Sequence, residues 1–204
     1  MLRPAGFGRA LLERRGRTLP HAVAQLADAA AARPLAPDAP TAASEPLTAA
    51  ALARAAESLA REFELRPAYD DDYLGWLLGE AEAVRARGPL QRRLVTANGA
   101  IAGWYVAYMP EGGVAQALQV GCGERQSGAV LDRLFADADA AGCAAVQGRL
   151  EPALLAAVRN RRCLVRRSEW ALVAAQEPEL LTAIAYGRAL LTRLDGEWWM
   201  GHHL

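Results

Sequence analysis

The feature that most constrains the fold is a strand–turn–strand pattern in the middle of the chain. Two segments of alternating character, Leu90–Ala97 and Ala100–Met109, are joined by the dipeptide Asn98-Gly99. Asn-Gly supplies the two positive-φ positions of a type I′ turn, which connects antiparallel strands tightly. A second turn at Pro110–Gly113 leads into the apolar segment Val114–Val120. The sequence therefore predicts three consecutive antiparallel strands.

Helical and extended patterns alternate on both sides of these strands. A helix over Gly128–Ala141 joins the third strand to a strand at Cys143–Leu150, and such a crossover makes the two joined strands parallel. The other expected elements are a helix at Leu47–Arg61, a strand at Phe63–Pro67, helices at Asp70–Arg87 and 152–161, a strand at Cys163–Ala175, a helix at Glu177–Tyr186 and a strand within 189–200. The order predicts an α/β (α+β) fold whose mixed sheet is an antiparallel meander followed by a parallel βαβ unit.

Apolar periodicity indicates which side of the helix Asp70–Arg87 is buried. At helical spacing, one stripe contains Tyr73, Trp76, Leu77, Ala81 and Val84. We expect this stripe to face the core.

The chain divides by composition at about residue 46. Residues 1–46 read as a helical extension followed by a linker, because 34–46 holds four prolines among small residues. We expect 34–46 to lie outside the core and residues 47–204 to form the main domain. The extension is either a remnant of a preceding domain or an ordinary terminal segment, and the sequence leaves both interpretations open.

Charge and hydropathy limit the function classes. The formal net charge is zero, which argues against broad nucleic-acid binding. No apolar run approaches the roughly 20 residues that span a bilayer, and the first residues lack the apolar core of a signal peptide. We therefore expect a cytoplasmic protein without a membrane span. All 23 basic residues are Arg, an arginine-for-lysine bias that we attribute to GC-rich, bacterial coding.

Cysteine and histidine positions argue against two kinds of site. Cys122, Cys143 and Cys163 form no metal-binding spacing, and the three histidines lie near the chain ends. The sequence therefore predicts no metal site in the main domain. It also disfavours a nucleophile activated by histidine.

The meander followed by a parallel βαβ unit resembles the GNAT acyltransferase superfamily over Phe63–Met200. The resemblance implies that an acyl-CoA donor such as acetyl-CoA lies where the fourth and fifth strands, Val114–Val120 and Cys143–Leu150, splay apart. It also implies that the pyrophosphate sits on the loop before the next helix. There the family has Q/R-x-x-G-x-G/A; Arg125 and Gly128 match its first two fixed positions, and Val130 stands at the third. The cofactor-binding residues so implied are Leu118, Val120, Gly123, Arg125, Gln126, Ser127, Gly128 and Ala129.

The same loop has a purely structural interpretation. Free N–H groups and the macrodipole make a helix N-terminus an anion site. Ser127, however, could equally be the N-cap of an ordinary strand-to-helix turn.

Three residues are candidates for catalytic roles, and none is assigned. Glu151 follows a strand at the mouth of the expected cleft and could act as a general base, or it could only favour the dipole of the helix opened by Pro152. Tyr108 could line the acceptor site or pack in the core. Glu169 lies in an expected strand of unknown register.

Two functions follow from the resemblance. The first is an acyl-CoA-dependent N-acyltransferase acting on a small-molecule or peptide amine, with a cell-envelope sugar or peptide as one class of acceptor. The second is a non-catalytic GNAT-like module that binds another subunit, a second copy or a second GNAT-like domain. A fold alone does not decide between them, because function depends on the site.

Overall fold

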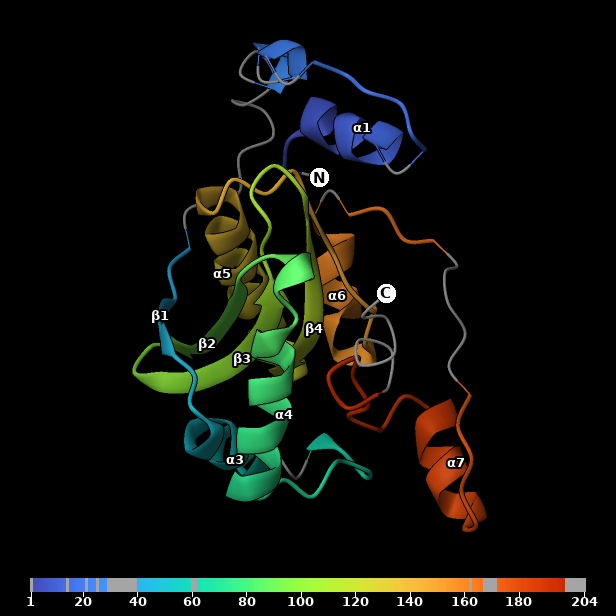
Figure 1. Ribbon diagram of the computed structural model, residues 1–204. Coiled ribbons are helices and arrows are strands. Elements are labelled where there is room, and N and C mark those ends of the chain that lie inside the picture. Colours follow the sequence, from blue (N-terminus) through green and yellow to red (C-terminus); the bar gives the residue numbers. More distant parts are fainter. Residues whose placement is uncertain are drawn as a thin grey trace.

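A computed structural model describes residues 2–13, 15–20, 22–24, 26–28, 40–59, 62–161, 163–166 and 172–196. Within this part of the chain, one mixed sheet has the strand order β1-β2-β3-β4-β5. The strands are β1 (Ala43–Pro46), β2 (Leu90–Ala97), β3 (Ala100–Tyr108), β4 (Val114–Cys122) and β5 (Ala145–Gln147). The first four pair antiparallel and β4 pairs parallel with β5 (Figure 1). The expected mixed sheet, a meander followed by a parallel pair, is therefore confirmed.

The central hairpin has the turn that its sequence predicts. Asn98 and Gly99 both have positive φ, 53° and 78°. Pairing runs from Ala97 opposite Ala100 to Leu90 opposite Tyr108. Because side chains alternate between the two faces, this register fixes which residues of β3 meet each neighbouring layer.

We expect Gly99→Ala to lower the free energy of unfolding by about 1 kcal/mol, because alanine is strained at positive φ. Nothing lies within 4 Å of a Cβ built at Gly99, so backbone strain is the only cost. Urea unfolding followed by circular dichroism measures the change. An unchanged midpoint would show that the turn does not depend on glycine.

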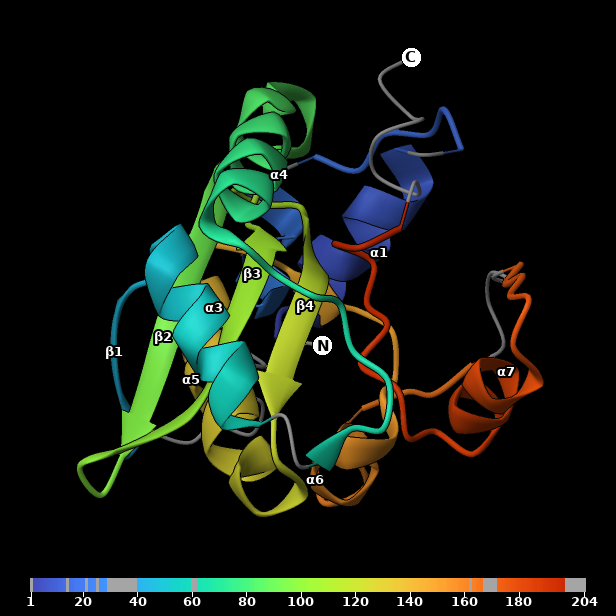
Figure 2. The ribbon, with the colours of Figure 1, turned by 90° about the horizontal axis from the view of Figure 1, so that it is seen from below.

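Helices cover both faces of the sheet. On one face lie α3 (Ala49–Ser58) and α4 (Asp71–Ala83), and on the other lies α5 (Ser127–Ala140) (Figures 1 and 2). Trp104 and Tyr108 of β3 pack with α3 and α4, whereas the neighbouring Tyr105 packs with α5. The structure therefore has three layers with two apolar clusters, one on each side of the sheet.

The start of the sheet differs from the sequence prediction. Ala43–Pro46, expected in the linker, is the edge strand β1, and Ala42 and Leu47 beside it are buried. An edge strand tolerates Pro46 because the missing N–H can face away from the sheet. The prediction for 34–46 was thus wrong from Ala42 onward, and residues 34–39 lie outside the described part.

Phe63–Pro67 is not a strand of the sheet. It makes only an isolated parallel bridge between Leu65 and Ala189, with hydrogen bonds from the Glu64 and Leu65 N–H groups to the Arg188 carbonyl. No strand of the sheet therefore separates α3 from α4, and both helices lie between β1 and β2 in the chain.

Helix α4 buries a different stripe from the one that we expected. Leu77, Ala81 and Val84 are buried as predicted, but Tyr73 is 37% exposed and Trp76 is 50% exposed. Leu74 and Leu78 fill the core in their place. Tyr73 and Trp76 shifted the predicted stripe toward the exposed face, because an apolar pattern counts aromatic rings as hydrophobic whether or not they are buried.

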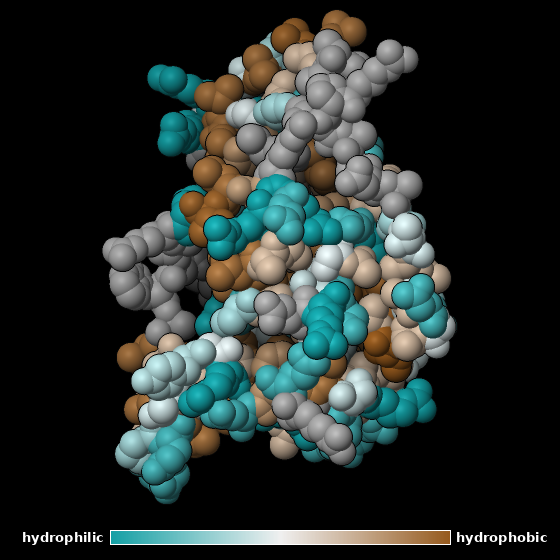
Figure 3. Space-filling model, turned by 180° about the vertical axis from the view of Figure 1, so that it is seen from behind, coloured by the Kyte–Doolittle hydropathy of each residue, from teal (hydrophilic) through white to brown (hydrophobic). Residues whose placement is uncertain are grey.

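The segment after β5 contains less strand than predicted. Strand β5 has three residues rather than Cys143–Leu150, and it is followed by η4 (Pro152–Leu154), α6 (Leu155–Arg159) and α7 (Pro178–Ala185). The described parts of the two expected later strands, 163–166, 172–175 and 189–196, form no strand beyond the bridge at Ala189. Seen from behind, α7 lies in the lobe at the lower left of a surface that mixes hydrophilic and hydrophobic side chains (Figure 3).

The N-terminal extension contacts the main domain. Helix α1 (Pro4–Glu13) follows Leu2 and Arg3, whose N–H groups donate to the Ala144 carbonyl at 3.1 and 2.8 Å. The Arg3 guanidinium also pairs with Asp139 at 3.1 Å. These contacts hold the beginning of the chain beside the start of β5.

Candidate functional site

Strands β4 and β5 separate after a short paired stretch. Their register covers only Val114–Gln116 opposite Ala145–Gln147, while β4 continues to Cys122. Opposite Val106 and Ala107 of β3, the register jumps from Gln119 to Ala117, so Leu118 is the extra residue of a β-bulge. The second half of β4 therefore has an edge without a β5 partner, and we call the space beside it the gap.

A segment near the end of the described chain enters the gap. The Leu194 N–H donates to the Leu118 carbonyl at 3.0 Å. Backbone groups alternate between the two edges of a strand, so the N–H of Val120 lies on the same edge as this carbonyl. Leu118 and Val120, two residues implied as donor-binding, thus lie at the gap.

A cleft of about 1290 Å³ adjoins the gap. Its walls come from β4, β5, α5, α6 and the described parts of 163–173 and 184–196. Four of its lining residues also line a second, smaller cavity at the gap: Ala117, Val120, Arg149 and Thr192. This second cavity of about 10 Å³, lined by Glu151, Arg149, Thr192 and 117–120, is about the size of one water molecule. The first is large enough for an organic ligand of cofactor size.

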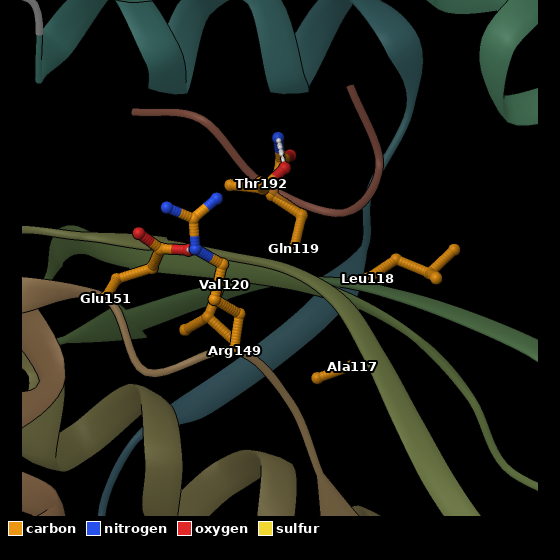
Figure 4. A pocket seen from close by; sticks show the side chains of 7 residues that line it. All are labelled: Ala117, Leu118, Gln119, Val120, Arg149, Glu151 and Thr192. Atoms are coloured by element: carbon orange, nitrogen blue, oxygen red, sulfur yellow. Dashed lines mark hydrogen bonds and ion pairs between the residues drawn. The ribbon is translucent and has the colours of Figure 1, made fainter. Parts of the chain in front are cut away.

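Glu151 lies at the edge of this gap (Figure 4). The residue is 9% exposed, and its pKa is raised to about 7, chiefly by burial, which the Arg149 guanidinium opposes and to which the Asp195 carboxylate adds. Arg149 Nε is 3.3 Å from Glu151 Oε1, yet that oxygen accepts no hydrogen bond from the described residues. A carboxyl that is half ionised near neutral pH can accept a proton there.

A buried polar network lies on the α4 side of the gap, and we call it the Asp195 cluster: Tyr69, Trp104, Gln119, Thr192 and Asp195. The Gln119 amide accepts from Trp104 Nε1 at 2.7 Å and donates to the Tyr69 hydroxyl at 2.8 Å and Thr192 Oγ1 at 3.1 Å. Tyr69 and Thr192 both donate to the Asp195 carboxylate. Burial raises the Asp195 pKa despite these donors.

Sequence reasoning missed this cluster. The available signal was Gln119, a polar residue near the middle of the largely apolar strand β4, because a buried amide needs partners. Its partners come from residues 69 and 192–195, which no local pattern connects.

The loop after β4 leads into helix α5 as expected. Gly123 precedes the short η3 (Glu124–Gln126), and α5 begins at Ser127 rather than Gly128. Gln126, not Ser127, holds the N-cap position, and its side chain makes no capping hydrogen bond. Arg125 is exposed and Ser127 is buried. The first turn of α5 is thus left without an N-cap side chain, which suits an anion.

Two charged side chains flank this loop. The Glu62 carboxylate lies over Gly123, because a Cβ built there would be 2.6 Å from Glu62 Oε1. On the other side, Arg161 donates to the Gly128 carbonyl at 3.0 Å and pairs with Asp132 at 2.7 Å. The loop therefore has one carboxylate that opposes an anionic ligand, while the charge of Arg161 is compensated by Asp132.

The other catalytic candidates lie elsewhere. Tyr108 is buried on the α4 side of the sheet, where its hydroxyl donates to the Ala81 carbonyl at 2.7 Å and burial raises its pKa to about 12. Tyr108 therefore packs in the core and does not line the cleft. Glu169 lies outside the described residues. Of the three candidates, the structure brings only Glu151 to the gap with Leu118 and Val120.

Comparisons of the chain with protein-family models, curated proteins and solved structures found no significant match. The described residues contain no group of three or more His, Cys, Asp or Glu side chains placed to hold a metal ion. In the same part of the chain, no helix combines the length and apolar character that crossing a membrane requires. What the fold and site define is a mixed α/β protein with a cleft at a splayed strand pair.

Proposed function

We propose that this protein is an acyl-CoA-dependent N-acyltransferase, with acetyl-CoA as the simplest donor. The observation that carries the proposal is Glu151, a buried carboxyl with a pKa of about 7 at the point where β4 and β5 separate. The sheet order and the GNAT resemblance support the same site. The proposed acceptor is an amine, and the Glu151 carboxylate would accept the proton that its attacking nitrogen loses.

In this mechanism, Glu151 moves the proton and the β4 edge stabilises the developing negative charge. Glu151 takes a proton from the amine as its nitrogen attacks the thioester carbonyl. The Val120 N–H donates to the developing oxyanion, since it lies on the open edge of β4. As the carbon–sulfur bond breaks, the proton held by Glu151 passes to the departing thiolate, leaving an amide and a free thiol. Arg149 limits how far burial raises the Glu151 pKa.

The donor would reach beyond the cleft, whose lining includes Val120 of β4 and begins on α5 only at Leu131. Its pyrophosphate would meet the main chain between Gly123 and Ala129, at the uncapped N-terminus of α5. Arg125 is exposed beside this loop, and Arg161 lies against Gly128. The Arg125 guanidinium suits phosphate recognition, whereas that of Arg161 is already paired with Asp132.

Two contacts favour the second candidate, a non-catalytic binding module. The Glu62 carboxylate lies over Gly123, and Leu194 is bonded to the β4 edge at Leu118. Thermal denaturation with acetyl-CoA separates the candidates, because a ligand at 100 times its Kd adds about 2.7 kcal/mol to stability. No stabilisation by millimolar acetyl-CoA, or by longer acyl-CoAs, would leave the binding module as the function.

We expect Glu62→Gln to tighten acetyl-CoA binding by about threefold, because it removes an exposed like charge from the phosphate loop. Isothermal titration calorimetry measures the Kd. Glu64→Gln is the matched control, since Glu64 is also exposed, lies two residues away and pairs with Arg188. If both variants bind as wild type does, the pyrophosphate does not approach Gly123.

A further inference from the structure

The cleft beside the gap continues the path on which the donor would lie. The Gly112 N–H, just before β4, donates to the Gly142 carbonyl, just after α5, at 2.9 Å, so α5 runs back along β4 toward its start. On α5 the lining of the cleft runs from Leu131 to Phe135, just beyond the loop 123–129. The cleft therefore begins near the proposed thioester position on β4 and leads away from the phosphate loop.

The cleft is apolar at its floor and on its outer wall. At the floor, Leu134 of α5 and Leu154 of η4 are at most 3% exposed, so the cleft reaches down to the core. On the outer wall, Leu164 is 84% exposed and Leu172 is 98% exposed. Large apolar side chains left open to water around a cleft are typical of a binding groove. An alkyl chain would cover both sets of side chains.

Charge decides which substrate's chain can occupy the cleft. Its described lining contains three arginines and one carboxylate: Arg149, Arg166, Arg193 and Asp195. Arg149 is paired with Glu151, and burial raises the Asp195 pKa, which weakens the one negative charge. A protonated alkylamine acceptor would therefore meet mainly positive charge, which opposes its binding. The acyl chain of a donor brings no cation.

We propose that the cleft holds the acyl chain of the donor, and that the donor is an acyl-CoA with a long alkyl chain rather than acetyl-CoA. An acetyl group has a single methyl group and would leave the floor of the cleft uncovered. The role of the chain as part of the donor rests on the proposed acyltransferase function. Binding of the chain does not, because the apolar lining recognises it without the thioester.

The test is calorimetric titration of the full chain with decanoate, butyrate and decylamine, without CoA. Decanoate should bind at least about 60-fold more tightly than butyrate, because each buried methylene contributes about fourfold and at least half of the six further methylenes should be buried. Decylamine should bind at least about tenfold more weakly than decanoate. A decylamine affinity equal to that of decanoate would assign the cleft to the acceptor and overturn the proposal.

Charged substitutions on the outer wall locate the bound chain. Leu164→Asp and Leu172→Asp should each weaken decanoate binding about tenfold, because they place a charge against the alkyl chain. Both side chains are exposed, so neither change removes core packing. Leu180→Asp is the matched control, since Leu180 is a leucine of α7, 38% exposed, that does not line the cleft. It should bind decanoate as wild type does.

Three results would overturn the proposal. They are equal binding of decanoate and butyrate, equal binding of decanoate by wild type and Leu172→Asp, and self-association that excludes decanoate, since a second copy would then cover the cleft. In the active enzyme, kcat/KM for decanoyl-CoA should exceed that for acetyl-CoA, and the reverse order would remove the long-chain donor. If decanoate binds in the cleft but neither acyl-CoA binds or releases thiol, the acyltransferase function and the donor role fall while the chain-binding site stands.

Discussion

Glu151→Gln should lower kcat/KM for acyl transfer by about 10²- to 10⁴-fold, the range that general-base catalysis contributes. Glutamine keeps the shape of the side chain but cannot take a proton from the amine. The wild-type rate should rise with pH up to about 7 and then level off, because burial holds the Glu151 pKa near that value and only the ionised form is a base. The variant should lose this rise. Thiol release from acetyl-CoA with a panel of amines measures both.

Folding stability provides a second readout for the same variant. The Glu151 pKa is raised from 4.5 to about 7, so between these values the native state holds more protons than the unfolded state. Stability should therefore fall as pH rises through this window, by a few kcal/mol at most. Glu151→Gln should remove that loss and be more stable than wild type above pH 7.

A matched control separates catalysis from surface charge. Glu179→Gln changes an exposed glutamate of α7 and should leave both the rate and its pH profile unchanged. A Glu151→Gln variant with wild-type activity and pH profile would exclude Glu151 as the base.

Gly121→Val should cost at least about 3 kcal/mol of folding stability, the range of severe overpacking. A Cβ at Gly121 would lie 2.1 Å from the Trp104 ring, which is completely buried. Trp104 cannot move aside easily, because its Nε1 donates to Gln119 in the Asp195 cluster. Urea unfolding measures the loss, and tryptophan fluorescence should report a changed environment for Trp104.

Gly75→Ala is the control for this prediction. Gly75 lies within α4, and nothing is found within 4 Å of a Cβ built there. Alanine should raise stability by about 0.5–1 kcal/mol, the difference in helix propensity. Equal effects of the two substitutions would mean that Gly121 does not contact Trp104 as described.

The parts of the fold that the sequence predicts correctly are those set by local chemistry. The Asn98-Gly99 turn, the three meander strands and the helix at about Gly128–Ala141 each depend on neighbouring residues, and each is observed within a few positions. Turn geometry and hydrophobic periodicity act over short stretches of chain, so one sequence is enough to find them.

The parts that were missed depend on distant contacts. Strand β1 exists because Ala43–Pro46 pairs with β2 about fifty residues later, which no local propensity of a proline-rich segment indicates. The Asp195 cluster joins residue 69 to residues 119 and 195. For the site, the gap residues Leu118, Val120 and Glu151 were among the candidates, whereas Tyr69, Thr192 and Asp195 were not.

The early separation of β4 and β5 has a consequence for how the chain folds. Strands β2, β3 and β4 are joined by short turns, so their pairing closes small loops and costs little chain entropy. Strand β5 can join only after α5 has packed, and it then gains three paired positions. Residues 192–195 are more distant still along the chain. We therefore expect the meander to form the nucleus and the walls of the cleft to assemble last.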